Sequence, residues 1–597
     1  MTASIEALLR AWPSRLAGWL LLAAAALILL AAPARAQEKA DLIIHNADIW
    51  TVDRARPRAR AVAVRGNRIV KVGSESEILK LRGERTRMID AGGRLVLPGF
   101  TDAHTHFESA ADWMFEPRLV DVNDERLFLA RIAEVAKRVP EGMWIIGGDW
   151  SAKAAAAAAK RGDKSFKPYV PSLAAVDAIS ARHPVLLRRY DGAYFVNSKG
   201  MELIRIGRFT PDPANGAYAR DPRTGALTGM LYGSAGDRVE RTLPPRSRAR
   251  TMVGAKLMLK DLNRFGITGI HDIARVDAIS ETRTFHTAVE RFASSLELFQ
   301  QLRAQGALTV RVNPLLTLAT WQDLAAHGIS PGSGDDMIRF GALKTFIDAF
   351  MMFDPFLDTP GYAGDFTFRV VDEATMQRDI AAADAAGFDI GAHVTGDKAH
   401  HLYIDWLAQA AAANPPRDRR HRLIHAWYPT LPDIRRAGKL RMIADITPYH
   451  YIRERHEMEE KLGRERMATA QAWRTLADNG VRLSIGSDLP GSFDKSNIAP
   501  HDPFENIYYV TTRRGLGEPA GRTSPREVLS VAEAIEAYTL NPAFAAREEG
   551  ARGSITEGKL ADLIVLSRNI LTSRPEDIPK TTVLYTVLGG KIVHSAP

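Results

Sequence analysis

The chain has 597 residues, of which 46% are hydrophobic and 25% are charged, and a net charge of +9, which is mild for this size. Its length excludes a small module and favours one large domain with additions, or two domains. It contains no cysteine, which excludes disulfide bonds, a cysteine nucleophile and a zinc-thiolate site, so any metal must be held by nitrogen and oxygen.

Residues 1–36 have the pattern of a signal peptide. Arg10 and Arg15 precede an apolar run at 16–32, and the small residues of APARAQ follow. We predict cleavage before Gln37 and export to the periplasm or the outside of the cell, which removes three arginines and one glutamate and lowers the net charge to +7. The alternative is an uncleaved anchor, because an apolar run of this length nearly spans a bilayer.

Short alternating strands separated by turns follow this segment and return at the end of the chain. DLIIHNADIWTVD, AVAVRGNRIVKVG and RMIDAGGRLVLPG lie near the start, and ADLIVLSRNI and TVLYTVLGGKIVHS near the end. Their spacing favours a small antiparallel sheet. ADLIIHNADI and ADLIVLSRNI look like partners in one sheet, so we predict that residues 37–95 and 546–597 form one composite β-sandwich domain.

Residues 96–545 alternate strands with helical segments. The expected strands are RLVLPGFTDAH, GITGIHDIA, LTVRVNPLLTL, IRFGALKTFIDA, FDIGAHVTG, HRLIHAW, RMIADITPYH and VRLSIGSDLPG. Eight parallel β-α units predict an α/β fold, a TIM-like (β/α)8 barrel with catalytic groups at the C-terminal strand ends. Residues 107–260, between the first two strands, are interpreted as a cap over the substrate pocket, with a structural lobe away from the site as the alternative.

Two arginine clusters, RARPRAR at 54–60 and RDRRHR at 417–422, lie in turn-like segments without interleaved aromatic residues. We interpret both as solvated loops. The expected partner is therefore a small-molecule substrate and not a nucleic acid. We expect no stable membrane association after signal cleavage, and a homodimer remains an open alternative.

Imidazole and carboxylate side chains stand at several of the predicted strand ends. His104 and His106 share one face of the first strand because successive residues alternate, although this pair alone is weak evidence. His393, His425 and Asp488 end the fifth, sixth and eighth strands, which converge on the same barrel mouth. These are ligand types that zinc takes in hydrolytic sites with one position open for water.

Lys344 ends an apolar run, where an unpaired ammonium would be costly to bury. One interpretation is that carbon dioxide adds to the amine and forms N6-carboxylysine, an anionic carbamate that can bridge two metal ions. The other is that Lys344 pairs with Asp348 or reaches solvent. The residues alone leave both interpretations open.

Several motifs together resemble the metal-dependent amidohydrolase superfamily: PGFTDAHTHF, the split β-domain, GAHVTGDKA, the histidine of the sixth strand and GSDLP. The long insertion, GALKTFIDA and GVRLSIGSDLPG resemble its branch of N-substituted formamide deformylase-like and exoenzyme-regulator-like proteins, amidohydrolase family 3. The resemblance implies a divalent metal, with Zn2+ expected, in one or two positions. The implied ligands of the first ion are His104, His106 and Asp488.

In the two-metal version, a carboxylated Lys344 bridges to a second ion held by His393 and His425. In the one-metal version, His393 joins the first set and His425 orients the water or the substrate. Asp488 and His425 are the expected catalytic residues.

The implied activity is hydrolysis of a C–N bond in a non-peptide amide, an N-substituted formamide or a cyclic amide. A bound divalent ion lowers the pKa of its water from about 15.7 towards about 7 and polarises the scissile carbonyl. Asp488 would accept the water proton and pass it to the leaving nitrogen. Ester, lactone or carbamate hydrolysis, an isomerisation, or a non-enzymatic binding or regulatory role on the same fold are the alternatives.

Two positions depart from the pattern of the resembling proteins. RYDGAYFVNS, around Gly192, lacks the histidine that those proteins commonly carry in a DGH-like segment of the insertion. Ile424 stands where a glutamate often precedes the histidine of the sixth strand. We therefore expect a more apolar pocket.

The other histidines are weaker candidates. His271 and Asp272 are expected to pair structurally, and His400 and His401 to have surface or packing roles on a helix. His450 and His456, in a charged segment after the seventh strand, are weak candidates for substrate contact.

Overall fold

The computed structural model describes residues 39–243, 247–273, 285–348, 373–467, 469–491, 500–519 and 525–596. The predicted signal peptide lies outside the described residues. Within the described part of the chain, no helix is long and apolar enough to cross a membrane.

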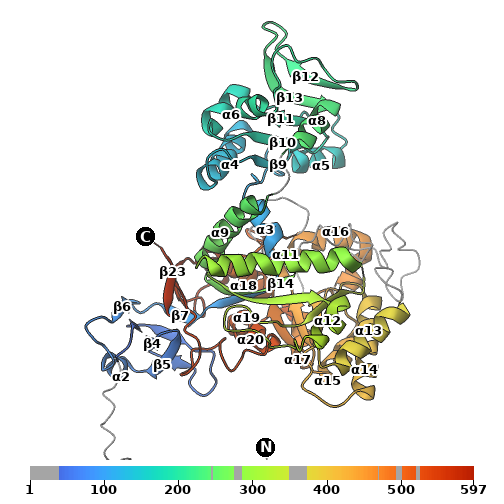
Figure 1. The fold of residues 1–597 in the computed structure, drawn as a ribbon. Helices are drawn as coiled ribbons and strands as arrows, with labels where there is room; N and C mark the ends of the chain where they lie inside the picture. The colour runs from blue at the N-terminus through green and yellow to red at the C-terminus, as the bar shows by residue number, and fades with distance from the viewer. Residues whose placement is uncertain are drawn as a thin grey trace, which may run out of the picture.

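Eight parallel strands form the barrel that the eight apolar runs predict (Figure 1). In chain order they are β8 (Phe100–Thr105), β14 (Ile267–Ile273), β15 (Arg311–Thr317), β16 (Leu343–Phe346), β17 (Ile390–Val394), β18 (Arg422–His425), β19 (Ile443–Ile446) and β20 (Arg482–Ile485). A bridge between Thr105 and Leu489 brings the last strand back to the first. A Cβ at Gly486 would lie 2.5 Å from the Cβ of His104, so this closure depends on a glycine.

Helices cover the outside of the barrel, as crossover connections between parallel strands require (Figure 1). They are α11 (Phe285–Ala304), α12 (Trp321–Ala326), α13 (Glu373–Ala385), α14 (Asp397–Ala413), α15 (Leu431–Lys439), α16 (Pro448–Met467), α17 (Trp473–Asp478), α18 (Pro503–Thr512), α19 (Val531–Tyr538) and α20 (Leu540–Ala545). Their apolar faces share one large core with the outward side chains of the strands, such as Leu423 and Leu483.

The first predicted strand is two strands. β7 (Leu95–Pro98) belongs to the terminal β-domain, and β8 begins two residues later in the barrel. Gly99 lies between them against Thr268, whose Oγ1 would be 2.2 Å from a Cβ at this position. The apolar run does not reveal where the chain passes from one sheet to the other, because both strands are buried along their whole length.

Both ends of the chain build a β-sandwich beside the barrel (Figure 1). One sheet contains β1 (Leu42–His45), β4 (Ala61–Arg65), β5 (Arg68–Gly73) and β6 (Arg87–Asp90), with α2 (Glu75–Leu79) against it. The other contains β2 (Asp48–Trp50), β3 (Arg58–Ala59), β7, β21 (Leu563–Leu566), β22 (Val583–Leu588) and β23 (Lys591–Ser595). Antiparallel pairing of β7 with β21 joins the two ends of the chain, which confirms the composite domain.

Two details predicted for this domain are wrong. ADLIIHNADI supplies β1, which lies in a different sheet from β21, the strand of ADLIVLSRNI, and only its last two residues enter the sheet of β21, in β2, which does not pair with β21. Pairing is also mixed, because β1 runs parallel to β6 and β2 parallel to β7. Ile44 of β1 and Val565 of β21 share one apolar core. The similar alternation of the two segments therefore reflects burial against the same core and not hydrogen bonding to each other.

The insertion between β8 and β14 carries a lobe that stands above the barrel (Figure 1). Its five-stranded sheet contains β9 (Ile145–Trp150), β10 (Val185–Arg189), β11 (Tyr194–Val196), β12 (Gly216–Arg220) and β13 (Leu227–Gly233). Its helices are α4 (Glu125–Arg138), α5 (Ala152–Lys160), α6 (Leu173–Ser180), α7 (Ser198–Leu203) and α8 (Ser234–Thr242). Phe128 and Trp150 belong to a core of its own.

Two helices, α3 (Phe107–Trp113) and α9 (Arg248–Arg264), connect the lobe to the barrel (Figure 1). They pack so closely that a Cβ at Gly254 would lie 2.0 Å from the carbonyl oxygen of Ala111. The insertion is thus attached through a tight helix pair rather than through extended linkers.

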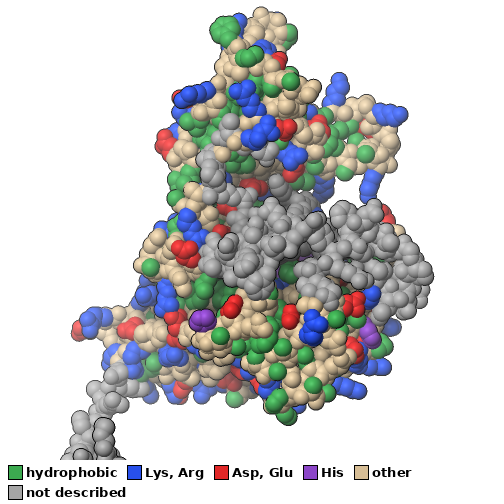
Figure 2. Space-filling model, turned by 45° about the vertical axis from the view of Figure 1, so that its right-hand side comes forward, with side chains coloured by type: hydrophobic (Ala, Val, Ile, Leu, Met, Phe, Trp, Pro, Cys, Tyr) green, Lys and Arg blue, Asp and Glu red, His purple; other side chains and the backbone are tan. Residues whose placement is uncertain are grey.

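The arginine cluster at 417–422 is not the predicted solvated loop. Arg417 and Arg419 form ion pairs of 2.7 and 2.9 Å with Asp384, and Arg420 pairs with Glu549 at 2.8 Å. Polar residues in a turn suggested solvent, but these side chains have acidic partners from distant segments. On the face shown in Figure 2, basic and acidic side chains are interspersed over lobe and barrel.

Candidate metal centre

The C-terminal ends of the barrel strands bring the predicted site residues to one mouth. β8 carries His104, and His106 is the N-cap of α3. Lys344 lies on β16, His393 on β17 and His425 on β18, and Asp488 follows β20. All these side chains belong to buried residues, none more than 6% exposed: His104, His106, Lys344, His393, His425 and Asp488.

The carboxylate of Asp488 lies between these histidines. Its Oδ1 is 3.0 Å from Nε2 of His104 and 3.2 Å from Nε2 of His106, and its Oδ2 is 3.5 Å from Nε2 of His450. The backbone N–H of Asp488 donates to the carbonyl of His104 at 2.8 Å. Asp488 adopts a φ of 55°, a left-handed conformation that aspartate tolerates better than most residues. The backbone therefore holds this carboxylate in place.

The ligand atoms form two groups, and within each group they all lie within 4.8 Å of one another. One group contains His104, His106 and Asp488, the set that the resemblance implies for the first ion. The other contains His425, His450 and Asp488. Among the described residues, the structure thus places His450, a weak candidate from sequence, beside the centre.

His393 lies next to His425, with ring centroids 4.5 Å apart. Its Nε2 is 3.9 Å from Oδ1 of Asp348. His393 therefore contacts the centre from the side of β17, where the described part of the chain places the carboxylate of Asp348 within 4 Å of it.

His425 reaches the mouth because the strand ends at this residue. Arg422, on the same strand, points into the barrel, and strict alternation would turn His425 away from it. A φ of 75° at His425 breaks the extended backbone, and its ring lies 4.9 Å from that of His104. Ile424 is fully buried in an apolar cluster with Leu315, so an apolar side chain occupies the position where resembling proteins often have glutamate.

Burial keeps the imidazoles in the form that binds metal. Desolvation lowers the pKa of His104 to about 3 and lowers the pKa values of His393, His425 and His450 as well. A neutral imidazole keeps a lone pair for a cation. Nδ1 of His104 and both ring nitrogens of His450 are buried, and no described residue forms a hydrogen bond with them. This set of nitrogen atoms and one carboxylate fits a divalent cation.

Asp488 remains ionised despite its position. Burial alone would raise the pKa of its carboxyl, but the imidazoles of His104 and His106 hold that pKa well below its usual range. The centre therefore combines neutral imidazoles with one anionic carboxylate.

Lys344 is 2% exposed, and no carboxylate of the described residues forms an ion pair with it. Its Nζ lies 4.6 Å from the centroid of the Phe346 ring. Burial lowers the pKa of Lys344 to about 7, although the carboxylates of Asp488 and Asp445 oppose the shift. Asp348 instead accepts hydrogen bonds from Thr395 and Gly396. Neither solvent nor an ion pair with Asp348 therefore accounts for this lysine.

A second polar layer crosses the barrel interior beneath the mouth. Arg422 donates to Asp445 at 2.6 Å, to the carbonyl of Ala103 at 3.0 Å and to Nδ1 of His271 at 3.0 Å. These bonds connect β18 with β19, β8 and β14. The predicted structural role of His271 is borne out by this contact.

Two buried aspartates brace the same strand ends. Asp102 accepts hydrogen bonds from the N–H of Ser487 at 2.9 Å and from its hydroxyl at 2.5 Å. Asp272 accepts from the N–H of Phe107 at 2.7 Å, directly after His106. Partners of this kind orient the groups that bind a metal.

The remaining histidines lie outside the two groups. Nδ1 of His400 is 2.7 Å from the carbonyl oxygen of Gly396, and His401 pairs with Asp433 at 3.2 Å. The side chain of His456 is 64% exposed. The structure therefore separates His450 from its neighbour His456, which the sequence treats alike.

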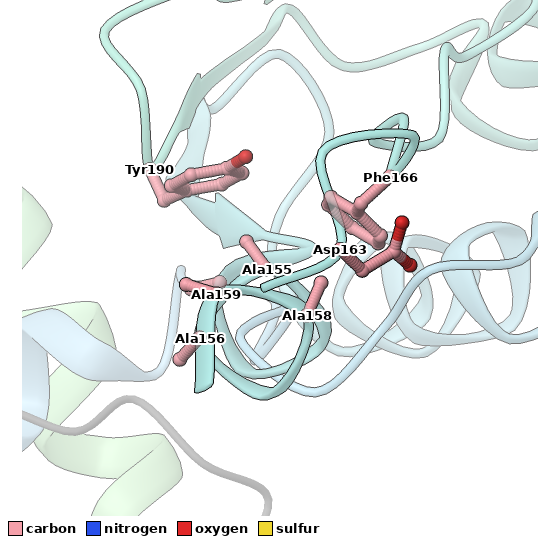
Figure 3. Close-up of a pocket in the computed structure, with 8 residues that line it drawn as sticks. Ala155, Ala156, Ala158, Ala159, Asp163, Phe166 and Tyr190 are labelled. Carbon is pink, nitrogen blue, oxygen red and sulfur yellow. The ribbon is translucent and has the colours of Figure 1, made fainter. Parts of the chain in front are cut away.

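The inserted lobe contains a pocket of about 450 Å³ on the alanine-rich helix α5 (Figure 3). Its lining residues are Ala152, Ala155, Ala156, Ala158, Ala159, Asp163, Phe166 and Tyr190. Methyl groups of α5 form one wall, and the rings of Phe166 and Tyr190 stand on opposite sides above them (Figure 3). Tyr190 begins the turn that lacks the expected histidine, so this turn borders an apolar pocket.

Comparison with known proteins agrees with this geometry. The model of the amidohydrolase family matches residues 87–594. Protein LONG AFTER FAR-RED 3 of Arabidopsis thaliana is 28% identical over 93% of this chain and 92% of its own length. N-substituted formamide deformylase of Arthrobacter pascens is 27% identical over 92% of this chain and 97% of its own. An uncharacterized metal-dependent hydrolase from Pyrococcus furiosus shares the fold, with a TM-score of 0.59 and 20% identity over 89% of this chain and 100% of that one.

Proposed function

Because the chain belongs to the amidohydrolase family, we propose that it is a metal-dependent hydrolase that cleaves the C–N bond of a small non-peptide amide. N-substituted formamides are the first candidate substrates and cyclic amides the second. The observation that carries the proposal is the buried group of His104, His106 and Asp488 at the barrel mouth. The relative named N-substituted formamide deformylase supports the substrate class.

The residues of the first group would hold one divalent cation, for which we propose Zn2+. His104 and His106 offer their Nε2 atoms and Asp488 offers Oδ1, the donor types that zinc takes in hydrolytic sites. A cation in this position would acidify a water molecule and polarise the scissile carbonyl. The anionic Asp488 accepts the proton of the attacking water and returns it to the leaving nitrogen. With one cation bound, His425, at the C-terminal end of β18, orients the substrate.

For Lys344 we propose conversion to N6-carboxylysine. The support is a buried amine with no acidic partner in the described chain. The carbamate would replace a cation by an anion and offer oxygen ligands beside His393 and His425. Intact-mass analysis under gentle conditions, with and without bicarbonate, tests this, and an unmodified lysine in both samples would contradict it.

The activity is tested on the purified chain supplied with Zn2+. We expect formate release from N-alkyl and N-aryl formamides, with slower turnover of the matching acetamides and of lactams. Esters and lactones of similar size provide the comparison. Turnover of the esters without any C–N cleavage would reject the proposed bond and favour ester hydrolysis in the same centre.

We also propose that the protein acts outside the cytoplasm. The support is the charge pattern and apolar run of residues 1–36. N-terminal sequencing of the protein recovered from a periplasmic fraction should begin at Gln37. A retained Met1 would indicate an uncleaved anchor.

A further inference from the structure

His450 is held beside the centre by the first turn of α16. It follows β19 by a few residues, and its backbone N–H donates to the carbonyl of Thr447 at 3.1 Å. The residue is 3% exposed. Its ring lies 5.7 Å from that of His425 in a stacked arrangement and 5.5 Å from that of Trp427, edge to face. Packing against these two rings therefore fixes the orientation of the His450 ring.

The two ring nitrogens of His450 are available to a ligand. Among the described residues, neither Nδ1 nor Nε2 has a hydrogen-bond partner, although both atoms are buried. Buried polar groups are nearly always paired, and an exception at a mouth of a barrel indicates a ligand that the chain itself does not provide. Within the described ranges, the acidic atom closest to this ring is Oδ2 of Asp488, 3.5 Å from Nε2.

We propose that His450, His425 and Oδ2 of Asp488 form a second cation position beside the first. Their ligand atoms lie within 4.8 Å of one another, and two imidazoles with one carboxylate favour Zn2+ or a similar divalent cation. Asp488 bridges the two positions, because Oδ1 faces His104 and Oδ2 faces His450. Each carboxylate oxygen has two lone pairs, so Asp488 also retains its capacity to accept a proton.

This position differs from the second site that the resemblance implies. That site uses a carboxylated Lys344 with His393, whereas Nε2 of His393 faces Asp348 at 3.9 Å. Of the residues implied for the second ion, the new position uses His425. The new position therefore requires no modified lysine. It rests on the proposed function only in assuming that the first cation is bound.

Metal content of the full chain tests the inference without an activity assay. The protein is stripped with a chelator, loaded with excess Zn2+, dialysed and analysed for zinc per chain. The test variant is His450→Gln, and the matched control is His456→Gln on the same helix, whose side chain is exposed. We expect two equivalents in the wild type and in His456→Gln, and one in His450→Gln.

A second variant distinguishes loss of the cation position from a folding defect. His450→Phe keeps a ring between His425 and Trp427 but removes both nitrogen ligands, and circular dichroism reports whether each variant is folded. One equivalent in either folded His450 variant supports the position. Two equivalents in a folded His450 variant, or one in the wild type, would overturn it and leave the first cation intact. No zinc in the wild type would overturn the proposed function itself.

Discussion

The two ends of the barrel differ in how their buried charged and polar groups are paired. At the N-terminal end, Asp384 pairs with Arg417, Arg419 and His421 at 2.7, 2.9 and 3.2 Å. At the C-terminal end, the carboxylate of Asp488 faces several imidazoles, and Nδ1 of His104 and both ring nitrogens of His450 have no hydrogen-bond partner in the part of the chain that the structure describes.

This difference indicates that charged groups at the N-terminal end of the barrel serve stability, whereas those at the C-terminal end serve function. Paired charges at the N-terminal end connect segments that are distant in the chain, such as α13 and the segment before β18. Unpaired polar atoms at the C-terminal end cost stability unless a ligand satisfies them. Substitutions at the two ends should therefore separate loss of stability from loss of activity.

The largest effect is expected for Asp488→Asn. The change keeps the shape of the side chain but removes an anionic ligand and proton acceptor, so turnover should fall by about 10³-fold or more. Steady-state hydrolysis by the zinc-supplied variant measures the loss. Thermal unfolding of the metal-free proteins is the control, because it shows whether the variant is still folded under the assay conditions. Hydrolysis near the wild-type rate would refute the role of Asp488.

Asp384→Asn should produce the reverse pattern. Removing one partner of a buried ion pair costs about 3–5 kcal/mol of unfolding free energy, because the remaining charges stay buried without their counter-charge. Urea unfolding measures this loss, while zinc content of the folded variant should not change. Asp405→Asn is the matched control, since its pair with Arg436 is partly exposed and should contribute less than about 1 kcal/mol. Equal losses in both variants would contradict the distinction.

Acid should weaken the ion pairs at the N-terminal end. Burial opposes ionisation of Asp384, but hydrogen bonds from His421, Arg419 and Asn414 hold its pKa well below the usual range. A carboxyl with a lowered folded-state pKa contributes stability above its unfolded value of about 3.9, and this contribution is lost as the pH falls towards the folded-state pKa. Unfolding free energies of wild type and Asp384→Asn should therefore converge below about pH 4. A constant difference down to pH 2 would contradict this origin.

A small effect on stability is expected for Lys344→Met. Replacing an unpaired buried amine by an apolar side chain of similar length should change the unfolding free energy by less than about 1.5 kcal/mol, whereas activity should be lost with the proposed carbamate. Urea unfolding and formate release measure the two quantities. A destabilisation as large as that of Asp384→Asn would show that the C-terminal end also depends on paired charge.

Much of the fold and half of the centre follow from local sequence patterns. The eight apolar runs predict the eight strands because each run is long enough to cross the barrel and is bounded by polar turns. His104, His106 and Asp488 are found because strand alternation and strand ends determine which residues reach the mouth. Alternation leads to a wrong prediction for β1 and β21. The two strands show the same pattern because they are buried against one core, and not because they are hydrogen-bonded to each other.

Sequence by itself determined the barrel, the composite β-domain and the imidazole and carboxylate groups at its mouth, because burial and alternation act on neighbouring residues. Only the tertiary structure decided the partners of the charged groups. Arg417 and Arg419 meet Asp384 across the turn before β18, and His450 turns from a charged segment towards Asp488. Such contacts join residues from separate segments, and no local period encodes them. Packing alone brings them within bonding distance.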